Sequence, residues 1–310
     1  MLGWTNGVES ERYRDTSAEN FEGLERSWNP IGSNKMPGLR ASQEKSAISM
    51  RNDDFKAIYD RLRNPSDIKS VAKETGLDEE FLTVIFTQKV TRDTTKKFYR
   101  IQRIAPQLLR EWKGGKSMLQ LSRKHQFPPI LTGMMIFQAN GCSKKTFWKH
   151  VREPQSIADQ RLRREIVEIT KEDCVYSPWA NESQYKRGCW GEGQLQGWLN
   201  AKGLTYRTEK DLRGEFPKTP DCLLDEPIRV NGWDINWIES KASFGDKIEI
   251  GKNVRKQLEP YTELFGDGLV VYWFGFVDEV ENPPGIFITD ASLLHMDCKV
   301  LSTECKKPLG

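Results

Sequence analysis

The chain has 310 residues, of which 37% are hydrophobic and 29% charged, and its formal net charge is +3. This balance is typical of a globular protein, and the length suits about two domains. No apolar run approaches the ~18 residues that a membrane span needs, and the start of the chain lacks the apolar segment of a secretory signal. We therefore expect a soluble intracellular protein without a membrane partner.

Residues 1–50 are rich in Ser, Asn, Gly, Glu and Arg without sustained periodicity, which predicts a disordered tail. Residues 51–172 differ because their apolar residues recur at spacings of three and four, which predicts an all-α region. Two pairs of predicted helices with short turns resemble helix-turn-helix motifs, although ordinary helical bundles show the same pattern. The four helices span residues 66–74, 78–88, 119–125 and 130–139.

Basic residues concentrate within residues 81–150, which hold fourteen Lys and Arg against two acids, a net charge of +12. Residues 171–310 hold 17 Lys and Arg against 23 Asp and Glu, a net charge of −6. Basic side chains often form only a solvated face. The scarcity of compensating acids here nevertheless favours a nucleic-acid partner, and DNA above all. The candidate nucleic-acid-binding residues are Lys89, Arg92, Lys96, Lys97, Arg100, Arg103, Lys144 and Lys145.

Residues 173–310 change to a pattern of strands, and we expect a separate domain there. The run at residues 269–277 is apolar on both alternating faces, as in a central strand that is covered on both sides. The order of elements predicts an α/β fold in which helices flank a mixed sheet. The expected elements are a helix at residues 185–202, strands at 204–207, 220–224 and 235–241, a helix at 253–265, and strands at 269–277 and 286–288.

The six cysteines are scattered, without a Cys-x-x-Cys pair and with few histidines nearby. This spacing indicates neither a disulfide framework nor a zinc site, so we expect reduced thiols. The six are Cys142, Cys174, Cys189, Cys222, Cys298 and Cys305.

The predicted strand at residues 235–241 ends in charged residues. Alternation along this strand places Glu239 and Lys241 on the face that also carries Ile235 and Trp237. Asp221 follows a proline that suits the start or edge of a neighbouring strand, so a second carboxylate can lie beside Glu239. Ionised side chains are rarely buried without partners, and a divalent cation would be a partner for both acids.

Two carboxylates and a backbone carbonyl match the oxygen ligands that Mg²⁺ prefers, and they leave room for water and a phosphate oxygen. We therefore expect Mg²⁺ as the cofactor, with Mn²⁺ able to substitute. The candidate metal ligands are Asp221, Glu239, Ser240 and Glu192. Glu192 shares a helix face with Leu195 and Leu199, so it should point toward the sheet, either at the metal or at a lysine such as Lys241.

Other candidate residues could act on the phosphate or the water. Lys241 lies about 6.6 Å along the strand from Glu239 and could orient the attacking water or neutralise charge on the phosphate. Gln257 and Tyr261 lie four residues apart on one helix face and could hold the scissile phosphate, although this spacing is also common in packing. The candidate catalytic residues are Asp221, Glu239, Lys241, Glu192, Gln257 and Tyr261.

Three stretches of sequence surround these residues. They read Lys-Thr-Pro-Asp at 218–221, Trp-Ile-Glu-Ser-Lys-Ala-Ser-Phe-Gly-Asp at 237–246, and Phe-Gly-Asp-Gly-Leu-Val-Val-Tyr-Trp-Phe-Gly-Phe at 265–276. Together they resemble the codanin-interacting nuclease family, which is also named for its Thr-Pro-Asp motif and belongs to the PD-(D/E)XK, restriction-endonuclease-like superfamily. The resemblance is strong over residues 174–294 and fainter in the helical half.

The resemblance implies a Mg²⁺-dependent nuclease core behind helix-turn-helix segments. Asp221, Glu239 and Lys241 match the signature residues of the family, and Glu192 matches the helix acid that follows Gly188. The family is linked to the nucleus and to the scaffold codanin, so the resemblance also implies a nuclear or cytoplasmic protein with a codanin-like partner. The tail and the glycine-rich helix around Gly188 fit the family pattern less well.

The leading hypothesis is a metal-dependent nuclease that hydrolyses phosphodiester bonds of DNA and that selects among DNA structures. An alternative is a catalytically silent nucleic-acid-binding or scaffold module, which would use the basic residues without turnover. A nuclease that acts on RNA is a further alternative, because basic helices alone do not distinguish a deoxyribose from a 2′-hydroxyl.

Overall fold

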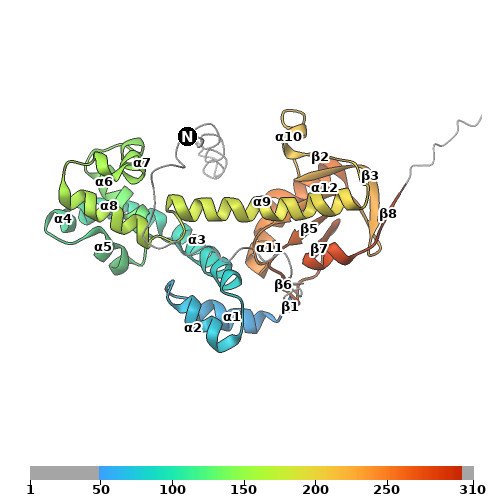
Figure 1. Ribbon diagram of the computed structural model, residues 1–310, viewed down its shortest axis with the longest axis horizontal. Coiled ribbons are helices and arrows are strands. Elements are labelled where there is room, and N and C mark those ends of the chain that lie inside the picture. Colours follow the sequence, from blue (N-terminus) through green and yellow to red (C-terminus); the bar gives the residue numbers. More distant parts are fainter. Residues whose placement is uncertain (1–48, 302–310) are drawn as a thin grey trace, which may run out of the picture. The chain divides into compact units, whose positions relative to one another are not determined.

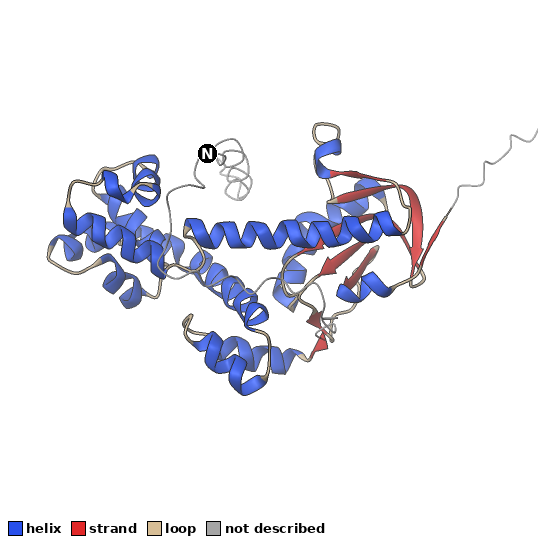
Figure 2. Ribbon diagram, in the orientation of Figure 1, coloured by secondary structure: helices blue, strands red, loops and turns tan. Residues whose placement is uncertain are grey.

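The computed structural model describes residues 49–301, which fall within one compact unit. Cys305 and nearly all of the tail predicted at residues 1–50 lie outside this range, and the five cysteines inside it are free. Figure 2 shows helices over most of the first part of the described chain and strands mainly in the last part. No helix within residues 49–301 is long and apolar enough to cross a membrane.

The first part of the described chain is helical, and its sequence explains where several helices begin. Asp78 precedes α3, and its side chain accepts bonds from the backbone amides of Glu80 and Phe81. Ser117 and Gln120 form a capping box at the start of α5. The elements are β1 (Ser49–Met50), α1 (Asn52–Arg61), α2 (Asp67–Thr75), α3 (Glu79–Arg103), α4 (Ala105–Lys113), α5 (Met118–His125), α6 (Pro129–Ala139), α7 (Lys144–Arg152), η1 (Pro154–Ser156) and α8 (Gln160–Glu172).

The two pairs predicted as helix-turn-helix motifs both form helices, but their burial differs. Gly76 ends α2 with a φ of 72°, a conformation that suits glycine, before α3 begins. In the second pair, every residue of α6 from 130 to 137 is buried. A recognition helix must expose one face to a DNA groove, so α6 is a core helix and does not fit that role. For α3, recognition of DNA stays a prediction.

The helices of the first part of the described chain contribute to two separate hydrophobic cores. The helical core runs from the end of α3 to α8 and includes Ile101, Met118 and Ile166. The shared core joins residues of α1, α2 and the start of α3 to residues of the sheet; Phe55 and Phe244 both belong to it. The domain boundaries expected after residues 50 and 172 stay predictions.

The last part of the described chain forms the mixed sheet that the sequence predicted. β3 pairs antiparallel with β2, β4 and β8, whereas β4, β5 and β7 run parallel, in the order β2-β3-β4-β5-β7. This arrangement confirms an α/β fold with helices around a mixed sheet. The elements are α9 (Pro178–Ala201), β2 (Tyr206–Thr208), α10 (Glu209–Leu212), β3 (Cys222–Val230), β4 (Trp233–Lys241), α11 (Lys247–Asn253), η2 (Val254–Leu258), α12 (Glu259–Phe265), β5 (Gly268–Tyr272), β6 (Phe276–Val277), β7 (Ile286–Asp290), η3 (Ala291–His295) and β8 (Cys298–Val300).

Helices cover both faces of the sheet (Figure 1). On one face, Leu195 of α9 packs with Ile238 in the shared core. On the other face, Leu258 packs with Trp237 in a third core that also includes residues of α11 and α12. Alternate residues of β4 therefore point to different cores. Ile235 departs from the predicted alternation because it packs in the shared core, and the pairing of β3 with β4 shifts register nearby.

The helix predicted at residues 253–265 begins earlier, at Lys247, and it is not α-helical throughout, because a π-helical turn at Val254–Leu258 lies between α11 and α12. Pro260 accounts for this turn. It has no amide hydrogen to donate to the carbonyl of Lys256, four residues earlier, and that carbonyl accepts a bond from the Lys218 side chain instead. The strand predicted at residues 269–277 is also divided, into β5 and β6.

Candidate active site

Asp221 and Glu239 lie side by side where β3 begins and β4 ends. Cys222 pairs with Ile238 across the two strands, which places the preceding Asp221 next to Glu239. The Asp221 carboxylate accepts a 2.8 Å bond from the backbone amide of Ser240, and the Asp221 amide donates to Glu239 Oε2 at 3.3 Å. The structure thus brings the two predicted carboxylates together at one edge of the antiparallel pair.

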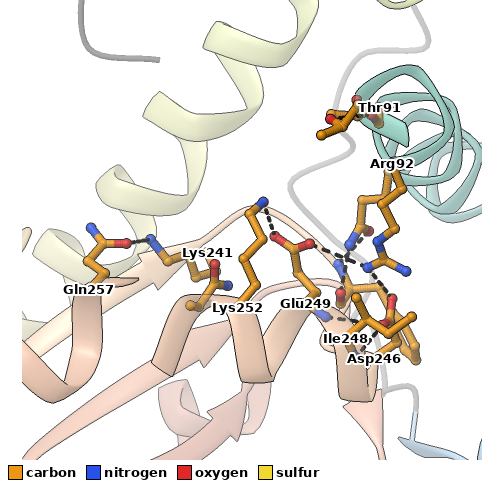
Figure 3. Close-up of polar contacts among 12 residues, drawn as sticks. Thr91, Arg92, Lys241, Asp246, Ile248, Glu249, Lys252 and Gln257 are labelled. Carbon is orange, nitrogen blue, oxygen red and sulfur yellow. Dashed lines mark hydrogen bonds and ion pairs between the residues drawn. The ribbon is translucent and has the colours of Figure 1, made fainter. Parts of the chain in front are cut away.

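Lys241 and Gln257 complete a polar network around Glu239. Lys241 Nζ lies 2.6 Å from Glu239 Oε1 and 2.7 Å from Gln257 Oε1. Gln257 Nε2 donates to the same Glu239 oxygen at 2.8 Å. Figure 3 shows Gln257, from the π-helical turn, pointing at Lys241. The side chain of Glu239 is only 3% exposed, so these donors replace the water that a buried carboxylate would lose.

Tyr261 supports this network from one turn further along. Its hydroxyl accepts a 2.8 Å bond from Gln257 and donates a 2.7 Å bond to the backbone carbonyl of Thr219. Burial and the Glu239 charge raise the pKa of Tyr261, so the phenol stays neutral at physiological pH. Tyr261 therefore orients Gln257 and fixes the chain just before Asp221. The hydroxyl proton of Tyr261 is already donated to the Thr219 carbonyl.

Glu192 and Ser240 have surroundings different from those expected. Glu192 is exposed on α9, so its side chain is not buried against the sheet, although its charge contributes to raising the pKa of Asp221. The Ser240 hydroxyl accepts a 2.7 Å bond from Trp273 Nε1. Gly191 lies against this pair, since a Cβ there would come within 2.6 Å of the Trp273 ring and 3.0 Å of Ser240 Oγ.

The electrostatics of the site disfavour negative charge on Asp221. Burial and the neighbouring Glu239 carboxylate raise the pKa of Asp221 well above its ordinary value, against the opposing effects of Lys241 and of the Ser240 amide. Burial and the same two acids also raise the pKa of the Cys222 thiol, which stays protonated. A cation bound near Asp221 and Glu239 would therefore relieve an existing repulsion.

The predicted ligands do not form a complete metal cluster. Within residues 49–301, no group of three or more His, Cys, Asp or Glu side chains is placed to hold a metal ion. The carboxylates that the structure does juxtapose are the pair Asp221 and Glu239, with Glu192 exposed on the neighbouring helix. Two acidic side chains suit an ion such as Mg²⁺, which usually binds one or two carboxylates and keeps several waters.

The residues predicted to bind nucleic acid fall into two groups. The Arg92 side chain is 13% exposed and forms ion pairs with Asp246 and Glu249. Lys89 and Lys97 are half-buried and donate to backbone carbonyls of other segments. The other five residues are exposed. They are Lys96, Arg100, Arg103, Lys144 and Lys145.

Sequence reasoning missed several contributors to the site. The π-helical turn that presents Gln257 had one signal, Pro260, in the middle of an apparently continuous helix. The carbonyl of Thr219 and the indole of Trp273 act through their positions in the fold, and no pattern in the sequence indicates them. The contacts that Arg92 makes with the segment after Lys241 were also not anticipated, because they join residues more than 150 positions apart.

The sequence of the chain is similar to those of several known proteins. The chain is 33% identical over 183 residues to "CDAN1-interacting nuclease 1" of Danio rerio, and 33% identical over 172 residues to the protein of that name in Homo sapiens. These alignments cover 56% and 53% of this chain and 61% of each relative. The chain therefore spans less than two thirds of the length of these curated relatives. No solved structure matches it significantly.

Residues 158–292 match the family model described as "Protein of unknown function TPD sequence-motif". The matched range contains the Thr-Pro-Asp motif that ends at Asp221 and the strand that carries Glu239 and Lys241. Over residues 158–292, which carry the site, the chain is therefore similar to the TPD sequence-motif family.

Proposed function

We propose that this protein is a metal-dependent nuclease of the PD-(D/E)XK type that hydrolyses phosphodiester bonds of DNA. The observation that carries this proposal is the network in which Asp221, Glu239 and Lys241 converge at the junction of two strands. The names of the similar proteins, which call them nucleases, support the reaction class. The exposed basic residues of α3 and α7 support a polyanionic substrate.

The cofactor that we propose is Mg²⁺, with Mn²⁺ as a substitute. The residues present fit such an ion, because the carboxylates of the buried Glu239 and the half-buried Asp221 are hard oxygen donors whose charges repel each other. A divalent ion bound there would supply positive charge for a phosphate oxygen and for the attacking water. We propose the Ser240 carbonyl as a further ligand and Glu192 as an acid that approaches from α9.

The chain's own residues can position and neutralise the substrate. Lys241 has three N–H donors, of which two are directed to Glu239 and Gln257. The third can donate to a phosphate oxygen or to the attacking water, and the ammonium charge would offset charge that develops on the phosphate. Gln257 fixes the Lys241 ammonium, and Tyr261 fixes Gln257, so the donor is already oriented before substrate binds.

The proposed partner follows from the names of the similar proteins and not from the site. Because the relatives are described as CDAN1-interacting, we propose that this chain also binds a codanin-like scaffold protein. A nuclear or cytoplasmic location would agree with a DNA substrate. Co-purification with such a scaffold, tested with the full chain, would examine this partner separately from the nuclease activity.

The nuclease is tested by incubating the full chain with branched, flapped and single-stranded DNA and with RNA, with and without Mg²⁺ or Mn²⁺. We expect cleavage of DNA that needs the metal ion and that is lost in Asp221→Asn and Glu239→Gln. Asp225→Asn, which changes an exposed acid of β3, is the matched control and should keep full activity. Cleavage that survives both site substitutions refutes the assignment.

The other outcomes distinguish the alternatives. Salt-dependent binding without cleavage under any metal would make the protein a catalytically silent nucleic-acid-binding module, since counterion release accompanies binding alone. Cleavage of RNA without cleavage of DNA would change the substrate and keep the site.

A further inference from the structure

The segment that follows Lys241 is held by a helix that lies outside the family-matched residues. Gln88 of α3 makes two bonds to the backbone of Phe244: Gln88 Nε2 donates to the Phe244 carbonyl at 3.0 Å, and the Phe244 amide donates to Gln88 Oε1 at 3.1 Å. A side-chain amide that satisfies both backbone groups of one residue fixes the position and the orientation of that residue.

Arg92, one helical turn after Gln88, holds the same segment by charge. Arg92 Nη2 lies 2.5 Å from Asp246 Oδ2 and 3.3 Å from Glu249 Oε2. Figure 3 shows the guanidinium between these two carboxylates. The three side chains are 13%, 4% and 14% exposed, so water screens these ion pairs little. Asp246 is also the cap of α11, since its other oxygen accepts from the amides of Ile248 and Glu249.

The Phe244 ring anchors the segment in the shared core. It is fully buried, stacks on Phe55 of α1 with ring centres 5.1 Å apart, and meets the edge of Phe81 of α3 at 5.5 Å. On the opposite side of the segment, the backbone of Gly245 is hydrogen-bonded to the turn before β6. A Cβ added to Gly245 would come within 2.8 Å of Phe276 Cβ. Residues 244–246 are therefore fixed between the first helices and the β5–β6 turn.

Residues 244–246 connect the two chain segments that contribute Lys241 and Gln257 to the polar network. Lys241 lies three residues before Phe244, at the end of β4. Asp246 is the N-cap of α11, which continues into the π-helical turn with Gln257. The 2.7 Å contact between Lys241 and Gln257 closes this loop of chain. A shift of residues 244–246 would therefore move the Gln257 side of the network relative to Lys241.

We propose, on the basis of the proposed function, that Gln88 and Arg92 are positioning residues of the nuclease site. They act through residues 244–246 and touch neither the substrate nor the reacting atoms. The functional unit then extends beyond residues 158–292 to include α3. The Arg92 guanidinium then positions residues 244–246 and is not part of the surface that binds nucleic acid.

The test compares Gln88→Glu, Arg92→Met and Arg92→Lys in the full chain, with cleavage kinetics on a DNA that the wild-type protein cleaves. Gln88→Glu removes the bond to the Phe244 carbonyl, and Arg92→Met removes both ion pairs. We expect each to lower kcat about 10- to 100-fold with little change in KM, because a small misplacement of reacting groups is costly. Arg92→Lys should recover part of kcat, since one ammonium can pair with one carboxylate at a time.

The matched control is Arg161→Met. Arg161 pairs with the buried Glu165 at 2.8 Å in the helical core, far along the chain from the site. Its removal should lower the Tm while leaving kcat unchanged. If Arg161→Met lowers kcat as much as Arg92→Met does, the loss reflects general destabilisation and the proposal is overturned. A rise in KM at unchanged kcat for Arg92→Met would instead assign Arg92 to substrate binding.

Amide hydrogen exchange gives a second measurement that does not need activity. In Gln88→Glu and Arg92→Lys, amides of residues 242–250 should exchange faster than in the wild type, while those of β5 and β7 keep their protection. Unchanged exchange at residues 242–250 contradicts the positioning role. If the wild-type protein cleaves no nucleic acid, the proposed function fails, and the exchange data still decide whether α3 holds this segment.

Discussion

Asp221 is an acid whose surroundings favour its neutral form. Burial and the Glu239 charge raise its pKa, so the folded protein holds the Asp221 proton more tightly than the unfolded chain does. The stability that this protonated form contributes is complete at low pH, and it is lost as the pH rises through the raised folded pKa. At neutral pH and without a metal ion, an ionised Asp221 should therefore weaken the fold.

Asp221→Asn should stabilise the metal-free protein, because asparagine imitates the neutral acid at every pH. With a chelator present, we expect the Tm of the variant to exceed that of the wild type near pH 8, and the two to converge near about pH 4, close to the ordinary pKa of aspartate. Thermal unfolding over this pH range measures the difference, with Asp225→Asn as the exposed control. A variant that melts below the wild type at pH 8 would indicate a structural role for the charge.

Lys241→Met should have the opposite effect. Its removal leaves the Glu239 carboxylate, which is 3% exposed, without a compensating charge, and breaking a buried ion pair costs about 3–5 kcal/mol. Lys247→Met is the matched control, because its pair with Glu279 is exposed and exposed pairs contribute about 1 kcal/mol or less. Urea unfolding in a chelator measures both free energies. Equal losses would mean that Lys241 does not stabilise Glu239.

At the scale of secondary-structure elements, α9 can approach β4 because residue 191 has no side chain. A Cβ on Gly191 would lie 2.6 Å from Trp273 Cδ1, on a ring that is held by its bond to Ser240. Nothing lies within 4 Å of the corresponding position on Gly193. The glycine-rich part of α9 thus contains one glycine that packing requires and others that it does not.

Gly191→Ala and Gly193→Ala should therefore change stability in opposite directions. Gly191→Ala forces the Trp273 ring or the helix to move, at a cost of about 1–3 kcal/mol for overpacking. Gly193→Ala should stabilise the protein by up to about 1 kcal/mol, the difference in helix propensity. Chemical unfolding measures both changes. If the two variants are equally stable, the contact between α9 and Trp273 is not tight.

The elements could be predicted from the sequence where a local pattern dominates. The alternation of β4 placed Glu239 and Lys241 on one face, and helices were expected in the right regions because helical periodicity does not depend on distant contacts. The helix ends were less accurate, since α3 runs to Arg103, past the end expected at residue 88, and α9 begins at Pro178, before the start expected at residue 185. The π-helical turn was missed, because whether a proline kinks, breaks or bulges a helix depends on donors elsewhere, here Lys218. The exposure of Glu192 was missed because helix periodicity shows which residues share a face, not how far that face is covered.

The whole molecule separates its charges along the chain. Within the basic block, α3 exposes Lys96, Arg100 and Arg103, whereas Lys89 and Arg92 contact other parts of the protein. The sequence shows how many cations the block contains, but not which of them are exposed and which contact the rest of the protein. That distinction depends on contacts between α3 and segments far away in the chain. The exposed cations are those that can release counterions from a nucleic acid.

Replacing Lys96, Arg100 and Arg103 by glutamine should weaken DNA binding at low salt. It should also flatten the slope of log K against log salt concentration by about 1 for each phosphate that the protein no longer neutralises. The control replaces Lys56, Lys69 and Lys73, three exposed lysines of α1 and α2 outside the basic block, by glutamine. Binding measured by fluorescence anisotropy at several salt concentrations gives both slopes. The same slope in both triple variants would argue against a role for α3.

We propose that Asp221 and Glu239 together hold the divalent ion of the proposed nuclease. Anomalous diffraction from crystals of the full chain soaked in Mn²⁺ tests it most directly. We expect a single strong peak within ligand distance of both carboxylates, and no peak there in crystals of Asp221→Asn. Mn²⁺ bound elsewhere, with the Asp221 and Glu239 carboxylates free of metal, would contradict it.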